Sequence, residues 1–136
     1  MRDPLVNLPG YVLRRAANAT GAELTGRLEV LGLRQSEVAA LYLLEAYPGI
    51  TSSRIGQTLD IQRANMVSFL GRLEDKGLIR RAPIDGRTQA IHLTGAGQKI
   101  LAAARKIVEA FEAELITRVP EEHRPHLLPA LLALWR

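Results

Sequence analysis

The clearest alternation of apolar and polar positions lies between residues 51 and 94, and its period changes partway along. Between residues 62 and 76 the apolar side chains recur at steps of three, one and three, as Met66, Phe69, Leu70 and Leu73. This spacing is that of a helix buried on one side. Gly77 follows at once, and glycine is the usual residue just past a helix end. The pattern therefore predicts an amphipathic helix over residues 62–76.

A shorter helix is predicted immediately before this one, over residues 51–59. Ile55 and Leu59 are four residues apart and so share one face. A hydroxyl of Thr51 or Ser52 can accept from an unpaired backbone N–H of the first turn and begin the helix. A break near residues 60–61 separates the two helices, which together form a helix–turn–helix.

After Gly77 the pattern becomes that of strands. Residues 78–82 and 88–93 are rich in β-compatible side chains. Asp85-Gly86 between them favours a tight turn, because glycine takes positive φ at little cost. A helix–turn–helix followed by such a hairpin is a winged helix, a shape whose second helix fits the major groove of DNA.

Helical patterns also precede this stretch. Residues 5–30 predict a first helix, whose start Pro4 and Pro9-Gly10 complicate, with the apolar stripe Leu5, Leu8, Val12, Ala16, Ala19, Leu24 and Leu28. Residues 31–33 are a break. Residues 34–46 predict a second helix, which Pro48-Gly49 ends. Its apolar positions are Val38, Leu41, Tyr42 and Leu44.

The end of the chain predicts two more helices. Thr94 can cap a long helix over residues 95–118, which Pro120 should stop. Residues 125–135 predict a shorter helix that is apolar around most of its circumference and must be covered by more than one neighbour. We expect the first helix and the last two to form the interface of a homodimer. The alternative is a bundle core within one chain.

Composition narrows the classes of protein. A length of 136 residues suits one domain, and a hydrophobic fraction of 47% excludes a disordered chain. Aromatic residues make up only 4%, which argues against a platform that stacks single-stranded bases. The absence of cysteine removes disulfides, thiolate nucleophiles and cysteine metal sites. Since neither a membrane span of ~18 apolar residues nor a secretory signal is visible, we expect a cytoplasmic protein.

The net charge of +4 is concentrated in the winged-helix stretch. Residues 51–94 carry seven lysine or arginine side chains and four aspartate or glutamate side chains, a net +3. A basic excess of this size favours a polyanionic partner without being diagnostic of one.

Three pieces of this part of the chain follow one another at characteristic distances. They are Arg72-Leu73-Glu74-Asp75-Lys76-Gly77-Leu78-Ile79-Arg80-Arg81, then Asp85-Gly86-Arg87, and then Leu93-Thr94 with Gly97. In this order and spacing they resemble the multiple-antibiotic-resistance regulator (MarR) family, and the resemblance extends over nearly the whole chain. Two features depart from the family pattern. Residues 62–65 lack the small hydroxyl side chains that are frequent there in such proteins. Gly86 stands where an arginine is frequent.

The resemblance implies a mainly α fold with a winged helix-turn-helix domain. Residues 1–136 would form a single MarR-like domain, with dimerisation helices over 1–30 and 95–136 and a DNA-binding lobe over 34–94. It implies a sequence-specific regulator of transcription that binds double-stranded DNA. Such a protein would be a repressor that binds a near-palindromic operator as a dimer and is released by a ligand. The alternative is a winged helix that binds another protein and no DNA, which the local basic excess argues against.

The helix over residues 62–76 supplies the expected base contacts. Arg63, Asn65 and Ser68 lie on its polar face, where arginine can pair with guanine edges and asparagine with adenine edges. Gln62 either reads a base or only begins the helix. The alternative for this face is a solvated surface, which any amphipathic helix needs.

The preceding helix and the hairpin supply the other expected contacts. The start of the helix suits phosphate contacts, and Arg87 can enter a narrow minor groove or pair with Asp85 to shape the turn. Of the two neighbouring arginines in the first strand, one is expected to face DNA and the other to bridge to a helix. The full expected set is Ser52, Ser53, Arg54, Gln62, Arg63, Asn65, Ser68, Arg72, Arg81, Asp85 and Arg87.

Members of the family often bind a small anionic or aromatic effector between the DNA-binding lobe and the dimer helices. On this resemblance the candidate lining residues are Tyr11, Arg14, Arg15, Tyr42 and Tyr47, since an arginine can hold a carboxylate or phosphate. The alternative is that the tyrosines belong to the core and the arginines to surface ion pairs.

No residues assemble into a specific catalytic pattern. His123 and His126 lie beside two glutamates, but this spacing is common at polar helix ends, so we expect neither a metal nor another cofactor. Neither a nucleophilic triad nor a glycine-rich phosphate loop is recognisable. We therefore do not expect an enzyme.

Overall fold

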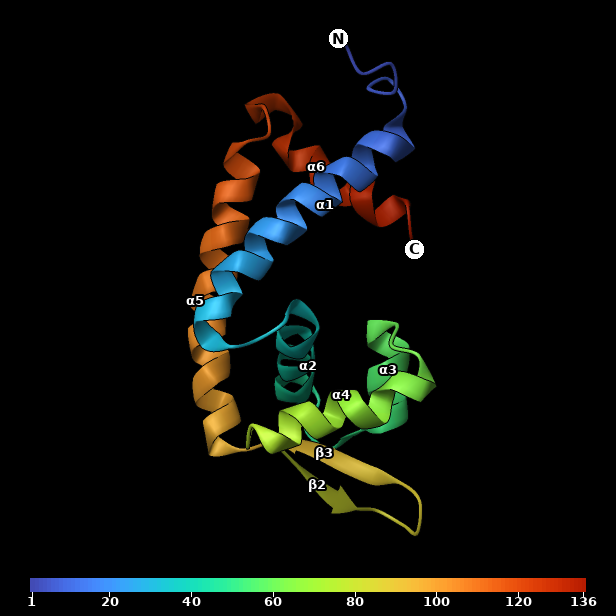
Figure 1. Cartoon of the computed structure of the whole chain (residues 1–136), viewed down its shortest axis with the longest axis vertical. Coiled ribbons are helices and arrows are strands. Elements are labelled where there is room, and N and C mark those ends of the chain that lie inside the picture. Colours follow the sequence, from blue (N-terminus) through green and yellow to red (C-terminus); the bar gives the residue numbers. More distant parts are fainter.

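The computed structural model describes residues 1–136, the whole chain. Figure 1 shows a lobe of helices and a small sheet at one end, a long helix along one side, and helices that cross in this view at the other end. The helices are α1 (Pro9–Leu28), α2 (Gln35–Ala46), α3 (Ser52–Leu59), α4 (Arg63–Asp75), α5 (Gly95–Thr117) and α6 (Arg124–Ala133). The strands are β1 (Ile50–Thr51), β2 (Ile79–Pro83) and β3 (Gln89–Leu93), and the short 3-10 turns are η1 (Glu29–Leu31) and η2 (Glu121–His123).

The expected mainly α winged helix is confirmed. α3 and α4 are the helix–turn–helix, and β2 and β3 form the hairpin, each strand beginning one residue later than expected. Gly77 has φ 71°, the left-handed conformation that ends α4 as its position indicated. The hydroxyl of Thr94 accepts from the N–H of Gly97 at 3.0 Å and caps α5.

The first helix begins later than expected. α1 starts at Pro9 rather than at residue 5, because proline lacks an N–H and suits the first helical position, while Leu8 before it is extended. The early part of the expected stripe is therefore not in the core: Leu8 and Val12 are exposed. Only the later part contacts the core, where Leu28 is fully buried.

The long helix was expected to end at residue 118, before Pro120, and it ends one residue earlier. α5 ends at Thr117, and Arg124 folds back so that its Nη2 donates to the Thr117 carbonyl at 3.2 Å and its Nε to the Val119 carbonyl at 2.9 Å. An arginine can thus take up carbonyls that a helix end leaves unpaired.

The sheet contains a strand that the sequence did not indicate. Its order is β1-β3-β2, all antiparallel, and β1 pairs only Ile50 with Ile91 and Thr51 with Ala90. This short pairing joins the start of α3 to the middle of β3 in the hairpin.

The core lies inside the lobe and reaches along α5 toward α1. Its fully buried apolar side chains are Leu28, Leu41, Leu44, Ile55, Leu70, Leu73, Ile91 and Leu101. α5 packs against both α2 and α1 of its own chain, so much of its apolar stripe belongs to an intrachain core. α6, by contrast, has no buried residue.

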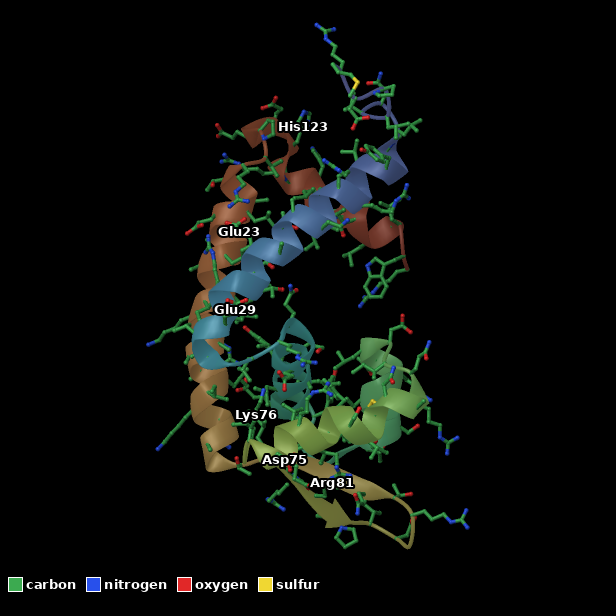
Figure 2. The ribbon with its side chains drawn as sticks, viewed as in Figure 1. Glu23, Glu29, Asp75, Lys76, Arg81 and His123 are labelled. Carbon is green, nitrogen blue, oxygen red and sulfur yellow. The ribbon has the colours of Figure 1, made fainter.

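One ion pair joins a buried carboxylate of this core to a partly exposed lysine. Glu37 near the start of α2 is fully buried, and its Oε2 is 2.9 Å from the Nζ of Lys76. Lys76 also donates to the Gly32 carbonyl at 2.9 Å, while Glu37 Oε1 accepts from the Arg34 N–H at 2.9 Å. Figure 2 shows Lys76 beside Asp75, where α4 ends. The pair therefore joins the end of α4 to the turn between η1 and α2.

Exposed ion pairs join α1 to α5. Glu23 Oε1 lies 2.7 Å from Arg118 Nη2 and 3.1 Å from Arg27 Nη2. Arg27 also forms an ion pair with Glu114. The hydrogen bond from Arg118 is the main cause that lowers the pKa of Glu23 below its ordinary value. Such exposed pairs contribute about 0–1 kcal/mol each to stability, so they align the two helices more than they stabilise them.

None of the helices combines the length and the apolar composition that crossing a membrane requires.

Candidate nucleic-acid interface

The turn between α3 and α4 is tight and brings the two helices close together. Asp60 has φ 54°, and the N–H of Ile61 donates to the Gly56 carbonyl at 2.9 Å. Gly56 is buried, and a Cβ there would lie 3.2 Å from both the Ile61 carbonyl oxygen and the Met66 Sδ. A small residue at this position therefore lets α4 cross over α3.

α4 presents the face that its period predicted. Met66, Phe69, Leu70 and Leu73 are buried. Gln62 precedes the helix in an extended conformation, and its side chain makes no capping bond, which leaves the amide free. Arg63, Asn65 and Ser68 are exposed, and the Ser68 hydroxyl donates to the Asn65 carbonyl at 3.1 Å.

An open groove of about 640 Å³ lies between α3, the start of α4 and the tip end of the hairpin. Four of the expected DNA-contact residues line it, which are Ser52, Ser53, Arg63 and Arg87. Most of the other lining side chains are polar as well, including Gln57, Asp60, Thr88 and Gln89. Segments far apart in the sequence thus place two cations on one polar groove.

The hairpin tip is shaped by Asp85 through the backbone. Its Oδ1 accepts from the N–H of Arg87 at 3.2 Å and from that of Thr88 at 3.0 Å. These hydrogen bonds lower the pKa of the Asp85 carboxyl below its ordinary value, and the bond from the Arg87 N–H has the largest effect. The expected pairing of Asp85 with Arg87 therefore exists, but it uses the amide of Arg87 and leaves the guanidinium free of any ion pair.

Three of the expected arginines lie away from the groove. Arg81 Nε lies 3.1 Å from Glu74 Oε2, so Arg81 is the arginine that bridges the hairpin to α4. Figure 2 shows Arg81 below α4. Arg72 lies over the ring of Phe69, and its Nε is buried without a partner. Arg54 lines a different hollow with Tyr47.

The residues proposed for an effector lie in separate places within one chain. Tyr11 donates to Asp3 at 2.8 Å and lies beneath Arg15, on the first turns of α1. Tyr42 lies beneath Arg105 of α5, and Tyr47 is exposed at the end of α2. Arg14 is exposed on α1. A shared pocket for these five residues remains a prediction, and one chain alone does not gather them.

Sequence reasoning missed two glutamines that line the groove. Gln57 follows Ser53 by one turn of α3, so the helical period places it on the same face. Gln89 begins β3 opposite Pro83, and only the register of the hairpin puts it there.

Comparison with known proteins agrees with this architecture. A sequence model of the MarR family matches residues 31–88. The transcriptional regulator HosA of Escherichia coli O111:H- is 31% identical over 98 residues, which cover 71% of this chain and 73% of HosA. The HTH-type transcriptional repressor Rv2887 of Mycobacterium tuberculosis is 29% identical over 112 residues, 81% of each chain.

Solved structures extend the likeness to the whole chain. The transcriptional repressor CouR, bound to a 23-mer DNA duplex, superposes with a TM-score of 0.91 at 31% identity over 100% of both chains. The similarity to CouR covers the flanking helices as well as the winged helix. The chain therefore belongs to the MarR family of winged-helix transcription regulators.

Proposed function

We propose that this chain represses transcription by binding a near-palindromic DNA operator as a homodimer. The observation that carries the proposal is the polar groove between α4 and the hairpin, with Arg63 at the start of α4 and Arg87 at the hairpin. If α4 lies in the major groove and the hairpin reaches the next minor groove, a sugar–phosphate strand must pass between them. The polar groove supplies a channel for that strand.

The first turn of α3 suits the phosphates of this strand. Thr51 accepts from the N–H of Arg54 at 3.3 Å and caps the helix, and Ser52 and Ser53 line the groove beside it. A helix N-terminus favours anions because its backbone N–H groups are unpaired and its dipole is positive. These contacts would position the protein, and the exposed face of α4 would read the bases.

The exposed apolar residues support a dimer. On α6 and just after it, Leu128, Leu131, Leu134 and Trp135 are exposed, and Leu5, Leu8, Val12 and Leu13 are exposed in and before α1. α1 and α6 cross at the end of the molecule away from the hairpin (Figure 1). Apolar residues gathered in this way mark an interaction surface. We propose that a second copy of the chain covers them.

The effector is proposed to be a small anionic aromatic compound. CouR has been solved with p-coumaroyl-CoA and Rv2887 with salicylic acid, and both ligands contain an aromatic ring and an anionic group. In this chain the dimer would bring Tyr11, Arg14 and Arg15 of α1 near Tyr42 or Tyr47 of a lobe. An effector that binds better when the two α4 helices are wrongly spaced would weaken DNA binding by that difference in affinity.

Selection of duplexes from a random pool tests the proposal. We expect wild-type protein to select two inverted half-sites about 10 base pairs apart and to bind them as two chains per duplex. Arg63→Ala and Asn65→Ala should each relax the preference at one position, at about 1–3 kcal/mol per half-site. Lys106→Ala, an exposed cation on α5, is the control and should select the wild-type sequence.

Two results would count against the proposal. Failure to bind any duplex, at low salt as well as high, would favour the protein-binding winged helix. Uniform loss of affinity in both variants, with the sequence preference intact, would mean that Arg63 and Asn65 only position the protein.

The salt dependence of binding should report the hairpin contact. Arg87→Ala is expected to lower the slope of log K against log salt by about one for each hairpin, hence by about two for a dimer. The reason is that its guanidinium is free of ion pairs and borders the groove. Arg80→Ala is the control, because it removes the same charge from the same hairpin. Arg80 lines a different hollow, together with Glu45 and His92. An affinity and a slope for Arg87→Ala that are unchanged from wild type would rule out an electrostatic role for Arg87.

A further inference from the structure

The outer face of α4 carries one large apolar side chain that the core does not use. Val67 is 76% exposed, whereas the other large apolar residues of α4 are buried. A single exposed apolar residue is common on protein surfaces, so exposure alone assigns no role. What distinguishes Val67 is its place on the helix.

Val67 lies on the side of α4 that faces the hairpin. Arg63, Val67 and Glu74 are separated by four and seven residues, which puts all three on one side of a helix with 3.6 residues per turn. Arg63 lines the groove together with Arg87, and Glu74 contacts Arg81 of β2. Since Val67 is mostly exposed, the hairpin does not cover it. The residue therefore stands where the proposed DNA would lie.

The residues around Val67 are small. Ala64, Ser68 and Gly71 are its neighbours on the exposed face, and a Cβ at Gly71 would meet nothing within 4 Å. None of these three neighbours has a long charged side chain, so on this side of Val67 a groove floor can approach the helix closely, while Arg63 lies one turn away on the other side. A valine in a helix keeps essentially one side-chain rotamer, which holds its two methyl groups in a fixed position.

Of the groups that base pairs present in the major groove, only the thymine C5-methyl is apolar. Valine can neither donate nor accept a hydrogen bond, so beside any other base edge it would displace water without replacing its hydrogen bonds. We propose that Val67 reads one thymine in each half-site by contact with its C5-methyl group. This inference rests on the proposed function and adds an apolar specificity contact to it.

Deoxyuridine substitution tests the contact, because it removes the methyl group and nothing else. In the selected duplex each thymine is replaced in turn, together with its symmetry mate, and binding is measured for wild type and Val67→Ala. At one thymine position per half-site we expect wild type to lose about fourfold per half-site, or about 15-fold in all, the effect of one buried methyl group on each side. Val67→Ala should bind the thymine and deoxyuridine duplexes almost equally at that position.

Val30→Ala is the matched control. Val30 is 80% exposed in η1, away from the groove, so the same truncation there should preserve both affinity and the response to deoxyuridine. If every deoxyuridine effect is the same in wild type and Val67→Ala, the inference is overturned while the proposed function stands. If wild type binds no duplex at all, the proposed function fails and this inference fails with it.

Discussion

Replacing Gly97 by alanine should destabilise the chain by about 3 kcal/mol or more, the range of severe overpacking in a core. Gly97 is buried in the first turn of α5, and a Cβ there would lie 2.1 Å from the carbonyl oxygen of Leu78. That oxygen belongs to the backbone and already accepts from the Thr94 N–H at 3.0 Å. The Thr94 hydroxyl in turn donates to the Gly77 carbonyl at 2.6 Å. Making room for a methyl group would therefore pull α5 away from the junction of α4 and β2.

Urea unfolding at one fixed protein concentration measures this loss, since the stability of a dimer depends on concentration. Gly95→Ala is the control in the same turn of α5, because a Cβ there meets nothing within 4 Å. It should stabilise the chain by about 0.5–1 kcal/mol, as alanine does in place of an exposed helical glycine. If the two variants unfold at the same urea concentration, the close approach of Gly97 to Leu78 has no energetic importance.

Lys76→Met should cost about 3 kcal/mol of unfolding free energy, because it leaves Glu37 buried without its cation. Removing one partner of a buried ion pair typically costs 3–5 kcal/mol, and the 38% exposure of the Lys76 side chain points to the lower end of that range. The Arg34 N–H would then be the remaining donor to Glu37. Methionine keeps the length of the side chain, so the loss would reflect charge and hydrogen bonds more than volume.

Arg105→Met provides the comparison for an exposed pair. Arg105 contacts Glu45, and their side chains are 33% and 49% exposed, so the loss should be at most about 1 kcal/mol. Both variants can be measured by the same urea titration. Equal losses would show that the burial of Glu37 does not raise the importance of its ion pair.

The parts of the fold that local pattern determines were predictable from the sequence. The spacing of Met66 to Leu73 and the glycine after it define α4 without reference to the rest of the chain. Elements that depend on distant partners were not. β1 is only two residues long and exists because it pairs with β3, about forty residues away, so no local signal marks it. The hydrogen bond from Arg124 to the Thr117 carbonyl at the end of α5 likewise joins two segments, and no local signal marks it.

The candidate site shows the same division. Arg63 and Arg87 were expected from their charge and from the elements that carry them, but only the packing of α3, α4 and the hairpin places them on one groove. Arg81 was expected to contact DNA, but its ion pair with Glu74 takes it to α4, and Arg80 beside it lines a different hollow. Val67 was missed because it belongs neither to the buried stripe of α4 nor to the polar residues from which base contacts were expected.

The length of α5 determines how far one end of the molecule moves when the other end rotates. It runs from the base of the hairpin to the end where α1 and α6 cross, and its 23 residues span about 35 Å at 1.5 Å per residue. Pivoting a rod of this length by roughly five degrees at the α1 and α6 end carries its other end about 3 Å. That displacement is close to the 3.4 Å rise between successive bases on a DNA strand. A small angular change at that end would therefore be enough to set α4 about one base pair out of register.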